Sequence, residues 1–168
     1  MQVFTIGYQG LKLEQYVESL LDAGVGIVLD VRETPWSYNR KYIKSVMANA
    51  LGESGVSYLH LKECGNPKEN RRTARTMEEC LDNYRDYLRK NTDCLSELGH
   101  EIRKAFEVGS PAALTCYERD PHDCHRTILL EELSRLVPDI QVTHIVIEPD
   151  STARKGRKIA SDTKGLRS

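Results

Sequence analysis

The chain has 168 residues, of which 39% are hydrophobic and 29% are charged, with a formal net charge of −1. This composition excludes a fibrous or disordered chain and fits one globular domain with a sizeable core. The apolar runs, such as residues 27–29 and 128–130, are far shorter than the roughly 20 residues of a membrane-spanning helix, so we expect no membrane partner.

The first half of the chain alternates strands and helices. An apolar run predicts a strand over residues 3–6, and helical spacing of apolar residues follows over residues 13–21. A second strand over residues 27–31 precedes a helix over residues 43–51, and a third strand covers residues 56–61. The polar stretch from Lys62 to Arg75 has almost nothing to bury, so it is expected to be a surface loop.

The second half continues this alternation. Thr76 and Glu79 have the spacing of a capping box at the start of a helix. Apolar spacing predicts two helices over residues 77–88 and 95–106, a strand over 112–116, a helix over 128–136 and a strand over 142–147. Strands alternating with helices predict a three-layer α/β fold, with a mainly parallel sheet of about five strands and helices on both faces.

The C-terminus differs from the rest in charge. Residues 154–168 hold six basic residues and one acidic residue, whereas residues 1–153 hold 18 basic and 24 acidic residues. We therefore predict a single domain over residues 1–150 and a basic, flexible tail over residues 151–168. The beginning of the chain lacks the pattern of a secretory signal, and its five cysteines have no regular spacing. These features predict a cytoplasmic protein with reduced thiols.

Polar side chains follow the first four predicted strands. Since the carboxyl ends of parallel strands meet at one edge of a sheet, where ligands bind, we expect these side chains to converge there. The candidate catalytic residues are Asp30, Glu118, Cys124 and His125. The candidate ligand-binding residues are Tyr8, Arg32, Ser37, His60 and Arg126.

Asp30 and Arg32 lie two residues apart at a strand end, where alternation places both side chains on one face. Arg32 would offer a planar fork to a phosphate or carboxylate, with Asp30 as its orienting group or as a base. Ser37 would add a hydroxyl to the same anion. The alternative is a structural ion pair that fixes the loop.

The sequence Cys116-x-Glu118 followed by Cys124-His125-Arg126 is the densest group of reactive residues. Cys124 is expected at a helix start, where the helix dipole lowers the pKa of a thiol. A thiolate there would be a nucleophile, with His125 or His122 as proton carrier and Arg126 holding an anionic group. For Arg126 the alternative is an ion pair with Glu118 or Asp30. The spacing is not the Cys-x5-Arg of thiol phosphatases.

Metal binding is a further interpretation of the same segment. Cys116, Cys124 and His125 are suitable ligands for zinc or iron, but their spacing matches no short zinc motif. A metal ion is therefore an alternative that the spacing does not favour, and the sequence identifies no cofactor.

Two further stretches have a composition suited to polyanions. Lys68, Arg71, Arg72 and Arg75 give the polar segment the character of an anion-facing surface. The single tryptophan, Trp36, could stack on a base or sugar, although packing is the more common role of such a residue.

Four separated motifs carry a resemblance to a known family. They read Thr5-Ile6-Gly7-Tyr8, Leu29-Asp30-Val31-Arg32 with Pro35-x-Ser37, Tyr58-x-His60-Leu61 with Gly65, and Cys116-x-Glu118 with Cys124-His125-Arg126. In content and order, from about Phe4 to Ile147, they resemble the domain-of-unknown-function 488 family, DUF488. The resemblance implies a compact α/β protein, mostly bacterial or archaeal, without an established activity. It groups Asp30, Arg32, Ser37, Glu118, Cys124, His125 and Arg126 as one constellation.

Three functions fit these observations. The first is an enzyme that acts on a phosphate-bearing ligand, such as a nucleotide or nucleic acid, with Glu118 or His125 as general acid or base. The second is a module that binds nucleic acid or a partner without catalysis. The third is a metal- or thiol-dependent redox protein. The residues leave open whether the chain is catalytic and whether it forms a homo-oligomer.

Overall fold

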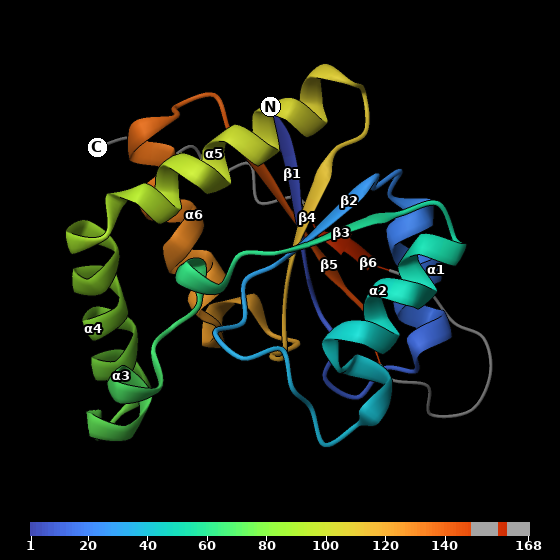
Figure 1. The fold of residues 1–168 in the computed structure, drawn as a ribbon. Helices are drawn as coiled ribbons and strands as arrows, with labels where there is room; N and C mark the ends of the chain where they lie inside the picture. The colour runs from blue at the N-terminus through green and yellow to red at the C-terminus, as the bar shows by residue number, and fades with distance from the viewer. Residues whose placement is uncertain (149–157, 161–168) are drawn as a thin grey trace.

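The computed structural model describes residues 1–148 and 158–160. Strands β1 to β5 form a parallel sheet whose carboxyl ends share one edge, at the bottom of the view in Figure 1. In spatial order the strands are β3 (Ser57–His60), β2 (Ile27–Asp30), β4 (Ala112–Cys116), β1 (Gln2–Gly7) and β5 (Gln141–Val146).

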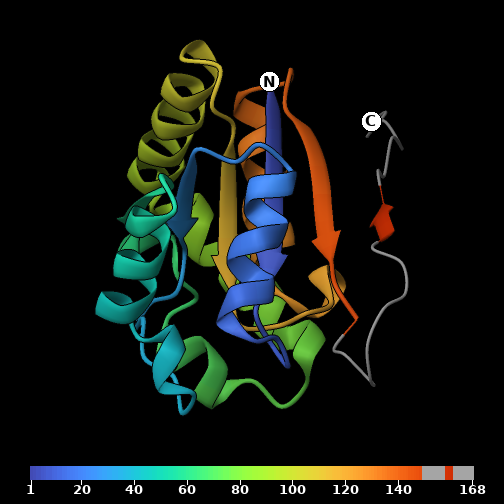
Figure 2. The same cartoon turned by 90° about the vertical axis from the view of Figure 1, so that its right-hand side faces the viewer.

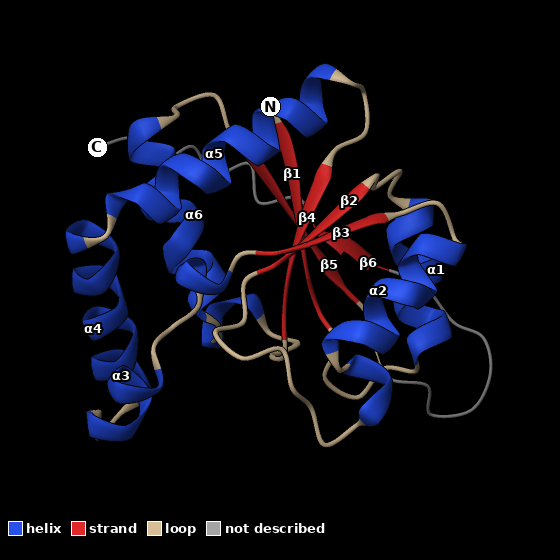
Figure 3. Cartoon of the chain, in the orientation of Figure 1, coloured by secondary structure: helices blue, strands red, loops and turns tan. Residues whose placement is uncertain are grey.

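Helices cover both faces of the sheet (Figure 3), and the side view of Figure 2 shows α1 in front of the strands. One face carries α1 (Leu13–Asp22) and α2 (Lys44–Glu53). The other carries α4 (Met77–Lys90), α5 (Thr92–Glu107) and α6 (His125–Leu136). Short helices within the loops are η1 (Arg40–Tyr42), η2 (Lys62–Cys64), α3 (Lys68–Thr73) and η3 (Pro121–Asp123). The predicted three-layer α/β fold is confirmed.

Two hydrophobic cores result from the alternation of side chains along the strands. Leu29 packs in the core under α4, α5 and α6, whereas its neighbour Val28 packs in the core under α1 and α2. Every residue of β4 is buried, because this central strand has a core on each side. Strand β4 is therefore a rigid base for whatever follows it at the carboxyl edge.

The chain leaves neighbouring strands toward opposite faces at this edge. Strand β1 pairs with β4 up to Gly7 and Cys116, yet β1 continues to α1 on one face and β4 to α6 on the other. The divergence of the two connections opens a crevice beyond the strand ends, which is where α/β sheets bind ligands. The topology therefore places the candidate residues of β1, β2 and β4 around one point.

The segment from Lys62 to Arg75 corrects one prediction. It is not simply a loop, because it forms η2 and α3, and Cys64 and Asn66 are buried. A Cβ atom added at Gly65 would lie 2.2 Å from the backbone nitrogen of Glu33, so the segment packs tightly against the loop after β2. None of the α3 side chains is buried, which explains why apolar spacing gave no helical signal.

Within the predicted tail, residues 158–160 form β6 (Lys158–Ala160), which pairs antiparallel with β5. The rest of the predicted tail lies outside the described residues.

Helices in the described part of the chain are all too short or too polar to cross a bilayer.

Candidate functional site

A cleft of about 1250 Å³ opens at the carboxyl edge of the sheet. Its walls come from the loops after β1, β2 and β4 and from the segment that includes α3 and the start of α4. The predicted site residues on these walls are Tyr8, Arg32, Ser37, Glu118 and His125. Asp30, His60, Cys124 and Arg126 lie behind the walls and do not line the cleft.

Four reactive side chains meet at the floor of this cleft, of which Cys116, Glu118 and His125 line it and Cys124 lies behind it. The ligand atoms of Cys116, Glu118, Cys124 and His125 all lie within 4.8 Å of one another. The Cys116 thiol donates to Glu118 Oε2 at 3.1 Å, and its Sγ lies 3.7 Å from His125 Nδ1. Cys124 Sγ lies 4.0 Å from the same nitrogen. We call these four residues the CEH cluster.

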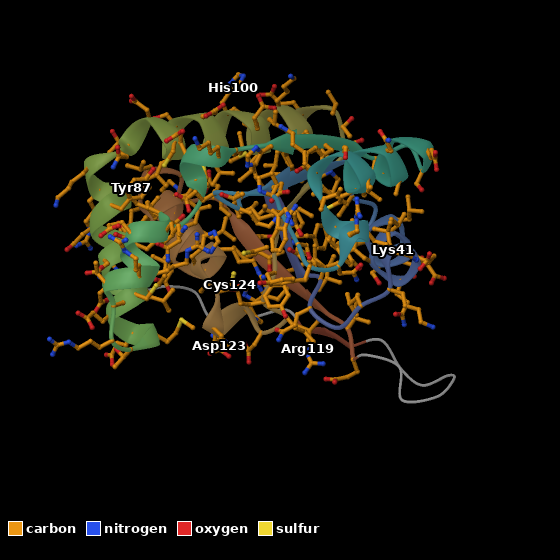
Figure 4. The ribbon with its side chains drawn as sticks, turned by 60° about the horizontal axis from the view of Figure 1, so that its bottom comes forward. Lys41, Tyr87, His100, Arg119, Asp123 and Cys124 are labelled. Carbon is orange, nitrogen blue, oxygen red and sulfur yellow. The ribbon has the colours of Figure 1, made fainter. Side chains whose placement is uncertain are left out.

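Local structure positions the CEH cluster. Cys116 ends β4, and Glu118 follows two residues later in the loop. Cys124 is the N-cap of α6 in an extended conformation, with φ −125° and ψ 140°, and His125 is the first helical residue. Figure 4 shows Asp123 and Arg119 at the outer edge of the molecule and Cys124 farther inside.

The hydrogen bond of His125 fixes its neutral tautomer. Nε2 lies 2.8 Å from the carbonyl oxygen of Val31, which can only accept, so Nε2 carries a proton. Nδ1 therefore has a lone pair that faces the two thiols when the ring is neutral. Burial acts to lower the pKa of His125, but the interactions with Cys124, the Val31 carbonyl and Glu118 together outweigh burial and raise the pKa above its usual value.

The two acidic groups of the cluster differ in protonation. Burial and the hydrogen bond with Cys116 raise the pKa of the Cys124 thiol well above its usual value, contrary to the lowering predicted from its place at a helix start. Burial also acts to raise the pKa of Glu118, but the hydrogen bond from Cys116 and a backbone hydrogen bond lower it overall. Glu118 is therefore a carboxylate at neutral pH, and Cys124 is a protonated thiol.

The placement of the thiols corrects the sequence analysis. Both thiols are buried, but Cys116 lines the cleft, whereas Cys124, the predicted nucleophile, lies behind its wall. Cys116 was predicted only as a weak metal ligand. Cys116 borders the cleft because its side chain lies on the cleft side of the end of β4. The sequence does not show which side that is, because every residue of β4 is buried and the strand has no alternation of apolar and polar residues.

Asp30 and Arg32 form the structural ion pair that was the alternative prediction. Arg32 Nε donates to Asp30 Oδ1 at 2.8 Å, and Arg32 Nη2 donates to Oδ2 at 2.5 Å. Nη1 donates to the Tyr8 hydroxyl and to the carbonyl oxygen of Tyr42. The hydroxyl of Tyr58 donates to Asp30, which is fully buried. These bonds occupy the guanidinium fork, so Arg32 lines the cleft without a free fork for an anion.

Arg126 holds backbone carbonyl groups, not a carboxylate. Its side chain is 1% exposed, and Nη1 and Nη2 donate to the carbonyl oxygens of Glu118 and Arg119 at 2.6 and 3.2 Å. Nη1 also lies 3.4 Å from Cys124 Sγ. On the other side of the loop, a Cβ at Gly7 would lie 1.7 Å from the Glu118 carbonyl oxygen. The predicted anion-holding role does not fit this geometry, in which Arg126 and Gly7 fix the loop that carries Glu118.

The remaining predicted residues support the walls. His60 Nε2 donates to the carbonyl oxygen of Arg32 at 2.8 Å and so holds the loop after β2. The Tyr8 ring stacks on Tyr42 with centroids 4.2 Å apart. Ser37 is half-buried on the cleft wall.

The opposite wall is basic. Lys68, Arg71, Arg72 and Arg75 line the cleft from α3 and the turn after it. Arg71 pairs with Glu33 at 2.8 Å and Arg72 with Glu69 at 3.0 Å. The side chains of Lys68 and Arg75 form no ion pair in the described part of the chain, and only the backbone N–H of Arg75 contacts a carboxylate, that of Glu79 at 2.7 Å. The charges of the two side chains are therefore available to a ligand.

Comparison with known protein families identifies the family of the chain. The profile of the family described as "Domain of unknown function DUF488" matches residues 12–133, a range that contains the CEH cluster and most of the cleft. No curated protein and no solved structure matches the chain. The matched range covers most of the α/β domain, and the chain therefore belongs to the DUF488 family.

Proposed function

We propose that the protein is an enzyme that acts on a phosphate-bearing ligand, a nucleotide either free or within a short single strand. The observation that carries this proposal is a basic cleft wall opposite a floor of reactive thiol, carboxylate and imidazole groups. A charged wall attracts the ligand, and groups that can transfer a proton act on it.

The charge of the cleft supports an anionic ligand. Five basic and three acidic side chains line it, although residues 1–153 as a whole carry an excess of acidic residues. Positive charge concentrated in one concave region of an otherwise acidic protein focuses the field there. The anion holders are then Lys68 and Arg75, in place of Arg32 and Arg126.

Aromatic side chains beside the basic wall support a base-bearing ligand. Trp36 and Tyr38 form an edge-on pair with centroids 4.6 Å apart, and Trp36 is 57% exposed. Both line the cleft, as does the half-exposed Tyr117. An aromatic ring exposed on a cleft wall can stack on any base, whereas a packing role would bury it.

The side chains at the floor of the cleft can accept and donate protons. Glu118 is a carboxylate that already accepts a hydrogen bond from the Cys116 thiol, and His125 lies beside both. Glu118 is thus suited to act as general base, and His125 as the group that returns the proton. The proposal includes a cytoplasmic location, which the free thiols of the five cysteines support. It also includes a bacterial or archaeal source, which rests on the family resemblance alone.

Fluorescence of Trp36 tests the ligand class, because it is the single tryptophan and it lies on the cleft wall. Nucleoside triphosphates or a short single-stranded oligonucleotide should quench it saturably, and added salt should weaken the binding. The variants Lys68→Ala and Arg75→Ala should each weaken binding about tenfold, equivalent to ~1.4 kcal/mol.

The control is Lys104→Ala, which removes an exposed positive charge on α5, away from the cleft. It should bind like the wild type. Equal binding of the nucleoside without phosphate, or no quenching by any of these ligands, would contradict the proposed ligand class. Free nucleotides and oligonucleotides are separate arms of the titration and distinguish the two sources of the phosphate.

A further inference from the structure

We propose that the CEH cluster is a binding site for one transition-metal ion of the zinc type, held by Cys116, Glu118, Cys124 and His125. This inference goes beyond the proposed function, because coordination by these residues does not depend on what the cleft accepts. Glu118 and His125 cannot transfer protons while they hold an ion, so the acid–base role proposed above belongs to the metal-free protein.

The spacing of the four donor atoms supports the site. Bonds of about 2.3 Å to sulfur and 2.0 Å to nitrogen in a tetrahedron place such ligand atoms about 3.5–3.8 Å apart. In the structure, His125 Nδ1 lies 3.7 Å from Cys116 Sγ and 4.0 Å from Cys124 Sγ. Glu118 Oε2 lies 3.1 Å from Cys116 Sγ. Small side-chain rotations would bring all four atoms to one centre.

The orientation of His125 is a separate observation that points to a metal. A metal-bound histidine characteristically donates its other ring N–H to a carbonyl or carboxylate group. His125 donates from Nε2 to the carbonyl oxygen of Val31 at 2.8 Å, so the lone pair of Nδ1 is directed toward the two sulfurs. The imidazole therefore has the tautomer and the support that coordination requires.

Charge balance favours a divalent ion. Two thiolates and one carboxylate carry three negative charges, and a divalent cation together with the buried Arg126 would neutralise them. Arg126 Nη1 lies 3.4 Å from Cys124 Sγ, where it would donate to a thiolate. On binding, the two thiols would lose their protons to solvent and the sulfur lone pairs would form the metal bonds.

The ligand types select the metal. Thiolate sulfur and imidazole nitrogen favour Zn²⁺ or Fe²⁺, whereas Mg²⁺ and Ca²⁺ prefer oxygen ligands only. The spacing of Cys116 and Cys124 in the sequence does not reveal this site, because the loop and η3 between them fold back and bring the two sulfurs close together. Cys116, Glu118 and His125 all line the cleft, so the ion would lie at its floor.

Elemental analysis of the full chain tests the site. Protein purified with a reducing agent and dialysed against metal-free buffer should contain about one zinc or iron ion per chain. After chelation, added Co²⁺ should produce thiolate-to-metal charge-transfer absorption. Cys124→Ser and Glu118→Gln should weaken Co²⁺ binding by at least about 100-fold, beyond the loss expected for a group that only orients a ligand.

The matched control is Cys80→Ser, which replaces a buried thiol on the cleft wall outside the CEH cluster and should keep the metal. Circular dichroism of every variant verifies folding, and Glu118→Gln, at a half-buried position, keeps the test valid if Cys124→Ser unfolds. A wild type that neither retains zinc or iron nor binds Co²⁺, or that contains a Cys116–Cys124 disulfide, would overturn the inference. Quenching of Trp36 by nucleotides is measured separately and turnover is measured with and without metal, so a failure of metal binding is distinguishable from a failure of the proposed function.

Discussion

Asp30→Asn is expected to lower the free energy of unfolding by about 3–5 kcal/mol, because it leaves the charge of Arg32 buried without a counter-ion. Asp30 is fully buried and accepts hydrogen bonds from Arg32 and Tyr58. Burial acts to lower the pKa of Arg32, but the hydrogen bonds and charge of Asp30 raise it overall, so the guanidinium stays charged. Urea denaturation followed by circular dichroism measures the loss.

An exposed ion pair provides the control for this prediction. Arg72 and Glu69 pair on the surface of α3, with side chains 72% and 64% exposed. Glu69→Gln should change the free energy of unfolding by less than about 0.5 kcal/mol. A loss below about 1 kcal/mol for Asp30→Asn would show that Arg32 is solvated or finds another partner.

Arg126→Met is expected to cost about 2–4 kcal/mol, because it leaves the carbonyl groups of Glu118 and Arg119 without their donor. Methionine retains much of the side-chain volume, so the loss reports mainly on the hydrogen bonds. The same loss should be measured with and without added phosphate, because the guanidinium does not line the cleft. Thermal and urea unfolding in the two buffers measure it.

The control for this variant is Arg103→Met, which replaces an exposed arginine on α5 and should have a small effect. Stabilisation of the wild type by phosphate that disappears in Arg126→Met would contradict the structural role. That result would restore the anion-binding role predicted from the sequence.

Local patterns were sufficient to predict the layers and one contact of the site. Alternation of apolar strands and amphipathic helices predicted the parallel sheet, and the spacing of Asp30 and Arg32 predicted that their side chains meet. The predictions failed where contacts between distant parts of the chain determine the partner of a side chain. Arg126 follows Cys124-His125 as expected, but the approach of Gly7 to the loop leaves its guanidinium bound to carbonyl groups.

Local patterns also failed to predict the structure of the basic wall and of the floor of the cleft. The charges from Lys68 to Arg75 were visible in the sequence, but α3 has no buried side chain and thus no apolar signal. The identity of the thiol on the cleft depends on the face that the end of β4 presents. Pairing of β6 with β5 was also beyond local patterns, since a strand of three residues in a charged segment has no apolar alternation.

Turnover tests most directly whether the cleft is an active site. The wild-type protein, both as purified and after removal of metal by chelation, is incubated with nucleoside triphosphates and short single-stranded oligonucleotides, and the products are identified by mass spectrometry. The enzyme proposal predicts a product whose rate of formation in the metal-free protein falls about 10²–10⁴-fold in Glu118→Gln, the variant without the proposed general base. Nucleotides should still quench the Trp36 fluorescence of that variant. Saturable binding without any product in the wild type, or unchanged turnover in Glu118→Gln, would contradict it and leave the cleft as a binding surface.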